Sequence, residues 1–272
     1  MKNCPFCTSS KYVVVKTFDL GCLGSSWLRA FKFNPFTKHE GDMLKLRCAE
    51  CDLTYYDPAI YGESDLYETL SKFSWYYEDD KWEFDEAIDY ITKIRPDSLL
   101  EIGCGEGIFL EKVQHLVDKV EGIDINTDAL ATCKKKGLSV YLPSENNSQT
   151  YDMIVLFEVL EHLEQPAAII SDIVNMLNDG GILIIAVPNP DGYLKGILAP
   201  VLLDMPPHHN TSWSEKTFNF LAEKYSFEKI GYATEPLRYV HYISYQLDVM
   251  KSFSSSKKST FSMKIAMKIL GL

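Results

Sequence analysis

The sequence feature that most constrains the fold is the run LLEIGCGEGIFLEKV, residues 99–113. An apolar stretch of strand length is followed by glycines at positions 103, 105 and 107, and then by an amphipathic pattern of helical period. Glycines permit a sharp turn from strand to helix and let a ligand approach the backbone, while the helix start offers N–H groups without intrahelical partners. The run therefore predicts a strand, turn and helix that bind a nucleotide-like ligand at the turn.

Apolar segments of strand length alternate with helical patterns through the middle of the chain. We expect strands at residues 98–102, 119–124, 138–142, 152–157 and 181–187, and helices at 109–116, 127–136, 167–177 and 214–225. This alternation predicts the α/β class with a doubly wound, mostly parallel sheet. Beyond the last helix, the segments FEKIGYA and YVHYISYQLDV, residues 227–233 and 239–249, alternate in the manner of antiparallel strands.

Two acidic residues narrow the choice of ligand. Glu101 precedes the first glycine by two residues, where its carboxylate would repel a pyrophosphate but suit an ammonium group. The dinucleotide pattern G-x-G-x-x-G would also need a glycine where this chain has Ile108. Asp124 ends the second strand, from which a carboxylate can accept both hydroxyls of a ribose. A ribose without pyrophosphate, joined to an amino-acid end, describes S-adenosylmethionine.

These motifs resemble those of the class I S-adenosylmethionine-dependent methyltransferases over about residues 98–190. LLEIGCGEG and VEGIDIN are similar to the first two motifs of that family, YDMIVLFEVLEHLEQP to the segment around its fourth strand, and LNDGGILIIAVPNP to its fifth strand. The resemblance implies a Rossmann-like methyltransferase fold. It also implies the residues around the cofactor: Glu101, Gly103, Cys104, Gly105 and Gly107 at the methionine end, Asp124 on the ribose, Ile125 beside the adenine, and Phe157 and Glu158 close by.

An aromatic and acidic segment, FSWYYEDDKWEFDEAIDYI at residues 73–91, stands just before this domain. We expect it to be largely helical. In the family that the chain resembles, this segment commonly covers the cofactor, which makes Tyr76 and Tyr77 candidates for cofactor binding. An aromatic core between two domains is the alternative.

Two C-x-x-C pairs lie near the start of the chain, CPFC at residues 4–7 and CAEC at residues 48–51. Four soft thiolates suit tetrahedral zinc, so Cys4, Cys7, Cys48 and Cys51 predict a closed, structural and non-catalytic Zn²⁺ site. LKLRCAECDLTYYDP resembles the second knuckle of the zinc ribbons at the N-terminus of many such methyltransferases. The 40 residues between the pairs exceed the simple zinc spacings, so we expect residues 20–36 to loop out. A redox pair and buried thiols are the alternatives, and Cys22, Cys104 and Cys133 are assigned to the core or to turns.

Three histidines are the candidates for catalysis. His208 and His209 lie in PPHHNTSW, on the long connection of residues 189–212, and loops of that length are more often functional than idle. His162 lies one turn after Glu158. Transfer to a hydroxyl needs a base as well as in-line placement of the acceptor, so any of the three could remove a proton. Packing and turn formation are the alternatives, and metal ligation is disfavoured because no third soft ligand is apparent near His208 and His209.

Charge and cysteine usage bear on partners and location. The net charge of −11 and the pI near 5.0 oppose binding to a phosphate backbone, so nucleic acid is disfavoured as a partner. The beginning of the chain lacks the pattern of a signal peptide, and seven cysteines form an odd set for disulfides, so we expect a cytoplasmic protein. The tail, residues 251–272, could form a basic amphipathic helix on an anionic membrane, but a frayed or partner-packed end is favoured.

Together these features predict three parts: a zinc-ribbon-like domain over residues 1–62, a methyltransferase domain over 63–250 and a basic tail over 251–272. The expected function is methyl transfer from S-adenosylmethionine to a small-molecule acceptor, with a sugar nucleotide or glycan precursor as the first choice. One alternative is an RNA methyltransferase that grips its substrate with the ribbon. Another is a protein that binds S-adenosylmethionine without catalysis.

Overall fold

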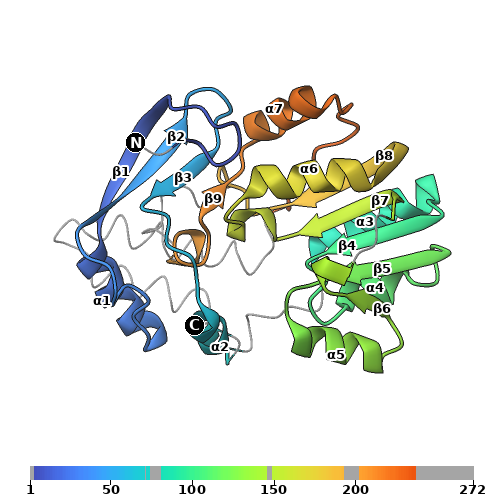
Figure 1. Ribbon diagram of the computed structural model, residues 1–272, viewed down its shortest axis with the longest axis horizontal. Coiled ribbons are helices and arrows are strands. Elements are labelled where there is room, and N and C mark those ends of the chain that lie inside the picture. The colour runs from blue at the N-terminus through green and yellow to red at the C-terminus, as the bar shows by residue number, and fades with distance from the viewer. Residues whose placement is uncertain (1–2, 71, 74–80, 146–148, 193–201, 237–272) are drawn as a thin grey trace, which may run out of the picture.

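The protein folds into two β-sheets that lie side by side, as Figure 1 shows for the computed structural model. The structure describes residues 3–70, 72–73, 81–145, 149–192 and 202–236. In that part of the chain, no helix combines the length and the apolar character needed to span a membrane. The larger sheet comes from the middle of the chain, and the smaller one is built mainly from the first 57 residues.

The larger sheet has five strands in the order β6-β5-β4-β7-β8, and every neighbouring pair is parallel. The strands are β4 (Ser98–Ile102), β5 (Lys119–Ile123), β6 (Ser139–Tyr141), β7 (Tyr151–Phe157) and β8 (Leu177–Ala186). All five predicted strands are present, which confirms the α/β class and the doubly wound topology. The carboxyl ends of the strands lie along one edge, where ligands bind in sheets of this kind.

Helices pack on both faces of this sheet because consecutive residues of its central strands are apolar and successive side chains point to opposite faces. Met153 and Val155 join a buried cluster with α3 (Trp82–Ile94) and α4 (Ile108–Val113). Ile154 and Leu156 point to the other face, into the cluster that contains residues of α6 (Pro166–Met176). The remaining helices and turns are α2 (Ser64–Leu70), α5 (Thr127–Lys135), η1 (Pro143–Glu145), η2 (Leu160–His162), η3 (Leu202–Asp204) and α7 (Glu215–Tyr225).

The smaller sheet is antiparallel, in the order β1-β2-β3-β9. Its first three strands are β1 (Tyr12–Asp19), β2 (Asp42–Cys48) and β3 (Thr54–Asp57). The fourth strand, β9 (Thr211–Ser212), comes from late in the chain, so this sheet joins an early and a late segment of the sequence (Figure 1). The domain boundaries at residues 62 and 250 stay predictions.

Residues 20–36 were expected to loop out between the cysteine pairs. They do leave the hairpin of β1 and β2, but as a helix that was not predicted: α1 (Leu20–Phe31) is capped by Asp19, and its Trp27 is fully buried. One local prediction was wrong. Residues 227–233 were expected to form a strand, but residues 227–236 are irregular, with Ile230 57% and Tyr232 51% exposed. An alternating pattern shows which face of a segment is apolar, but a β-strand also needs a neighbouring strand with which to pair. The second alternating segment, residues 239–249, lies outside the described residues.

Candidate active site

The turn between β4 and α4 is shaped by glycines at its middle and its end. Gly107 has a φ of +78°, and a Cβ there would lie 2.9 Å from the Cys133 sulfur, so packing against α5 excludes a side chain. Gly105 also has a positive φ, of +50°, but a Cβ there would meet no atom within 4 Å. The backbone at Gly105 therefore borders open space, which is what close approach of a ligand requires.

Two carboxylates lie on either side of this turn. Glu101 is 3% exposed, and its Oε2 has no hydrogen-bond partner among the described residues. Burial raises the pKa of Glu101 to about 8, against the opposing field of Lys81. An orphaned carboxylate oxygen of this kind fits the ammonium end of S-adenosylmethionine. Asp124 accepts from the backbone N–H of Gly105 at 2.8 Å and from that of Asn126 at 2.7 Å, which fixes its carboxylate beside the open turn.

The other predicted cofactor residues differ in how accessible their side chains are to a ligand. Ile125 is 84% exposed, so its side chain is available to a flat ring. Cys104 is buried against Gly122, and only its backbone can face a ligand. Phe157 packs between Phe84 and Phe109, with ring centroids 5.0 and 4.8 Å away. The predicted residues Tyr76 and Tyr77 lie outside the described part of the chain.

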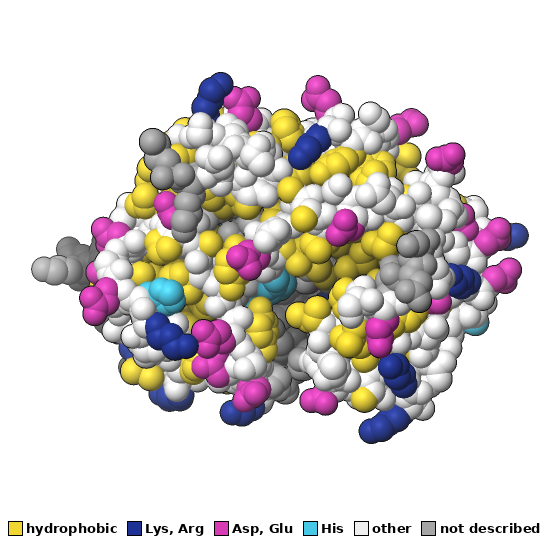
Figure 2. All heavy atoms as spheres, viewed as in Figure 1, with side chains coloured by type: hydrophobic (Ala, Val, Ile, Leu, Met, Phe, Trp, Pro, Cys, Tyr) yellow, Lys and Arg dark blue, Asp and Glu magenta, His cyan; other side chains and the backbone are white. Residues whose placement is uncertain are grey.

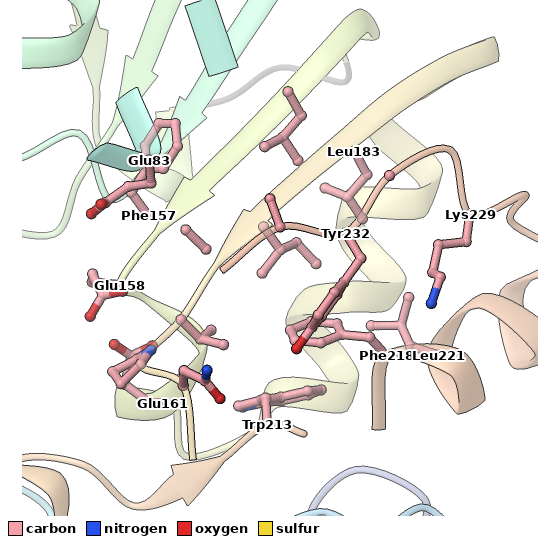
Figure 3. Close-up of a pocket in the computed structure, with 18 of the residues that line it drawn as sticks. Glu83, Phe157, Glu158, Glu161, Leu183, Trp213, Phe218, Leu221, Lys229 and Tyr232 are labelled. Carbon is pink, nitrogen blue, oxygen red and sulfur yellow. The ribbon is translucent and has the colours of Figure 1, made fainter. Parts of the chain in front are cut away.

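A groove opens at the ends of β7 and β8, and its two sides differ in chemistry. Figure 3 shows Glu83, Glu158 and Glu161 on one side, and Trp213, Phe218, Leu221 and Tyr232 on the other. In Figure 2 apolar side chains and a histidine border the hollow that crosses the middle of the molecule. An acidic side facing an apolar, aromatic side suits an amphiphilic small molecule.

The acidic side is strained and poorly solvated. Glu158 has a left-handed φ of 56°, an unfavourable conformation for a residue with a side chain. Burial, followed by the charge of Glu83, raises the pKa of Glu158 to about 7. Glu161 is 1% exposed, and neither of its carboxylate oxygens has a hydrogen-bond partner within the described chain. Burial, followed by the charge of Glu158, raises the pKa of Glu161 well above its ordinary value.

All three predicted catalytic histidines meet next to Glu161. The ring of His162 lies 4.8 Å from the rings of both His208 and His209, and those two rings stack at 4.4 Å between centroids. Burial lowers the pKa of His162 to about 4 and that of His209 to about 2, and it lowers the pKa of His208 as well. Each imidazole is therefore neutral at pH 7 and offers one nitrogen lone pair.

Backbone hydrogen bonds explain why residues so far apart in sequence come together. The N–H of Asn210 donates to the carbonyl of Glu161 at 2.8 Å, and the Thr211 hydroxyl donates to the carbonyl of Leu160 at 3.2 Å. The histidine segment, residues 205–213, is thus pinned to η2. Glu161 and the meeting of His162 with the other two histidines were not predicted from the sequence. For Glu161, the available signal was its spacing from Glu158 and His162 in EVLEH.

The histidine segment is also held by the N-terminal part. β9 pairs Thr211 with Tyr55 and Ser212 with Thr54, next to the second cysteine pair. Trp213, which is 1% exposed, packs on Phe6 between the first two cysteines, with ring centroids 5.1 Å apart. The two parts therefore share one buried core, which runs from the cysteines to the parallel sheet.

The four predicted zinc ligands converge. The Sγ atoms lie within 4.8 Å of one another, with Cys4 3.6 Å from Cys51 and Cys7 3.4 Å from Cys48. Zn–S bonds of about 2.3 Å place tetrahedral sulfurs about 3.8 Å apart, so this cluster fits zinc. Cys133 lies elsewhere and donates to the carbonyl of Gly105 at 3.3 Å, which agrees with a turn role.

Comparison with known proteins gives the family. The family model for a methyltransferase domain matches residues 80–231, more than half of the chain. The chain is 32% identical over 126 residues to the ubiquinone biosynthesis O-methyltransferase of Burkholderia ambifaria (strain MC40-6), which is 42% of this chain and 53% of that protein. It is 30% identical over 127 residues to the enzyme of that name from Colwellia psychrerythraea (strain 34H), or 42% of this chain and 52% of that protein. The matches span about half the length of these curated relatives.

Solved structures give similar matches. An S-adenosylmethionine-bound amino pentose methyltransferase from Micromonospora echinaspora aligns with a TM-score of 0.39 at 22% identity, over 50% of this chain and 61% of that one. A methyltransferase from Clostridium acetobutylicum ATCC 824 aligns with a TM-score of 0.39 at 17% identity, over 49% and 59%. Both scores are below 0.5, so family membership rests on the sequence match to residues 80–231.

Proposed function

The chain belongs to the methyltransferase domain family, and we propose that it transfers the methyl group of S-adenosylmethionine to a small-molecule acceptor. The observation that carries this proposal is the open turn at Gly105, which lies between the orphaned carboxylate of Glu101 and the fixed carboxylate of Asp124. S-adenosylmethionine, with a cationic ammonium group at one end and a ribose towards the other, matches this arrangement. The turn and the histidine groove lie at the same carboxyl edge of the sheet.

In this proposal the residues of the chain bind and orient the two reactants. Bound S-adenosylmethionine would supply an electrophilic methyl group. Glu101 would pair with its ammonium group, and Asp124 would accept hydrogen bonds from its ribose hydroxyls. When an acceptor hydroxyl attacks, the O–C bond forms as the S–C bond breaks, and the hydroxyl proton must leave. His209 lines the groove, and the rings of His162 and His208 pack against it, so these histidines would position the acceptor and assist the loss of its proton.

We also propose that the acceptor atom is oxygen and that the acceptor is a sugar nucleotide or glycan precursor. The curated relatives are named O-methyltransferases, which supports oxygen. The sugar is supported by the segment PPHHNTSWSEKTF, residues 206–218, which resembles a motif that recurs in methyltransferases associated with modified sugars and surface polysaccharides. RNA is less well supported, because Lys11 and Lys38 in the N-terminal part lie against Glu50 and Glu63. A cytoplasmic location, with reduced thiols, belongs to the same proposal.

A structural zinc ion at Cys4, Cys7, Cys48 and Cys51 completes the proposal. Zinc would cross-link the two cysteine turns, between which Phe6 and Leu53 are fully buried. Among the four thiols, only Cys7 is more than slightly exposed, so the set is closed to substrates.

The decisive experiment follows the methyl group. The protein is incubated with S-adenosylmethionine labelled in its methyl group and with a metabolite extract, and mass spectrometry identifies the compounds that gain the label. Asp124→Ala should label far less, whereas Asp128→Ala, an exposed acid on α5, should behave as the wild type. Label on RNA would favour the RNA alternative. Calorimetric binding of the cofactor without labelled product would favour a non-catalytic binding protein.

A further inference from the structure

The histidine cluster has the geometry of a second metal site, separate from the thiols. We propose that His162, His208 and His209 hold a divalent transition-metal ion, with Glu161 as the fourth ligand. One ligand atom from each histidine lies within 4.8 Å of those of the other two. The ligands come from η2 and from the histidine segment, which backbone hydrogen bonds fasten together.

The first support is the protonation pattern that the backbone imposes. Nδ1 of His162 lies 2.7 Å from the carbonyl oxygen of His208, and Nδ1 of His208 lies 3.1 Å from that of Leu203. A carbonyl oxygen only accepts hydrogen bonds, so each Nδ1 carries the proton. The lone pair of each of these two rings is then on Nε2. Histidines that ligate metals are held in this way, with the second ring nitrogen donating to a carbonyl or a carboxylate.

The second support is the position of the Glu161 carboxylate. Its Oε1 lies 3.8 Å from Nε2 of His162 and 4.0 Å from Nε2 of His209. These distances are too long for hydrogen bonds, but they are close to the roughly 3.4 Å between neighbouring ligands of a tetrahedral ion with bonds of about 2.1 Å. Glu161 therefore lies close to two of the three histidines, and a shift of its side chain would bring it to an ion that the three histidines hold.

The third support is that this carboxylate lies beside a second acid, Glu158, and forms no ion pair with a lysine or arginine in the described chain. Both of its oxygens are buried without a hydrogen bond, and the side chain is 1% exposed. A buried carboxylate without a partner is unfavourable by several kcal/mol, so a cation at this position would remove a large penalty. Besides the histidines, the charged neighbours of Glu161 are Glu158, which adds negative potential, and Lys81, which opposes it.

The donor set indicates the class of ion. Three imidazole nitrogens and one carboxylate oxygen suit Zn²⁺, Co²⁺ or Fe²⁺, whereas Mg²⁺ and Ca²⁺ prefer oxygen ligands. His209 and Glu161 both line the groove, so the ion would be accessible to a bound molecule. Its part in the reaction rests on the proposed function: there the ion would fix an oxygen of the acceptor opposite the methyl donor.

Cobalt distinguishes this site from the thiols. The full-length protein is stripped of metal and titrated with Co²⁺ while visible and near-ultraviolet spectra are recorded. We expect two equivalents to bind, one with strong thiolate-to-cobalt charge-transfer bands and one with ligand-field bands alone. His209→Gln and Glu161→Gln should lose only the second equivalent, and His115→Gln, an exposed histidine, should keep both.

The outcomes separate the two proposals. A single equivalent in the wild type, always with thiolate bands, would overturn the histidine site, as would unchanged binding in His209→Gln and Glu161→Gln. Circular dichroism and retention of the thiolate bands show that a variant is folded. Calorimetry with S-adenosylmethionine reports on the cofactor site independently, so a protein that binds the second Co²⁺ but no cofactor would contradict the proposed function and leave the metal site standing.

Discussion

The thiol cluster and the histidine cluster lie near the two ends of the same short connection, residues 205–214, yet their surroundings differ. The thiols sit in the core between two turns, and none of them is among the residues that line the groove in the described chain. His209 and Glu161 line the groove directly. Structural metal sites are closed and catalytic ones keep access, so we propose an architectural role for the first cluster and a chemical role for the second.

The comparison predicts that loss of one thiol is the most destabilising change. We expect Cys48→Ser to lower the free energy of unfolding by more than about 4 kcal/mol, because structural metal affinity contributes directly to folding. Urea unfolding, followed by circular dichroism, measures this loss. Cys22→Ser, at an exposed thiol outside the cluster, should change stability by less than about 0.5 kcal/mol. Equal stability of the two variants would break the assignment of Cys48 to an architectural site.

Substitution in the histidine cluster should reduce activity strongly and stability only slightly. We expect His209→Gln to reduce kcat/KM at least about 100-fold, since groups that position an acceptor or assist the loss of its proton contribute that much or more. Stability should change by less than about 1.5 kcal/mol, because glutamine keeps polarity and approximate volume. Cofactor affinity should be unchanged, which calorimetry checks. A variant that loses stability as Cys48→Ser does would show that His209 supports the fold instead.

Local and long-range features differed in how well the sequence revealed them. The strand, turn and helix around Gly105 were predicted because hydrophobic period and glycine positions are encoded within 15 consecutive residues, 99–113. The thiol cluster was visible because each C-x-x-C pair is a local unit. The partnership of His162 with His208 spans 46 residues and depends on tertiary hydrogen bonds, so no local pattern could specify it. Helix α1 was not predicted because residues 20–36 were interpreted from the spacing of the cysteine pairs and not from their amphipathic period.

The hydrogen bonds of Ser214, which link the two clusters, should contribute an intermediate amount to the free energy of unfolding. The Ser214 hydroxyl donates to the Asp52 carboxylate at 2.7 Å and accepts from the N–H of Thr217 at 3.3 Å, so it ties α7 to the second cysteine turn. We expect Ser214→Ala to lower stability by about 1 kcal/mol, the usual effect of losing a helix cap. Ser171→Ala, an exposed position in α6, serves as the control and should change stability by less than about 0.5 kcal/mol. Matching results for both serines would show that the link contributes little.

The last prediction concerns a single proton at Glu101, which has neither a metal role nor an architectural one in this comparison. Its pKa rises from 4.5 to about 8 because it is buried. Below pH 4.5 both folded and unfolded chains hold the proton, and above pH 8 neither does. Between these values only the folded chain holds it, so this group makes stability fall as pH rises through that window.

Cofactor binding should reverse this protonation. If the ammonium group of S-adenosylmethionine pairs with Glu101, it favours the charged carboxylate, and binding at pH 7 releases up to about one proton. Calorimetry in buffers of different ionisation enthalpy counts that proton, because the observed enthalpy then depends on the buffer. Glu101→Gln should bind more weakly and release none from this position. A buffer-independent enthalpy in the wild type would mean that the ammonium group is held elsewhere, and the orphaned oxygen of Glu101 would then need another cation.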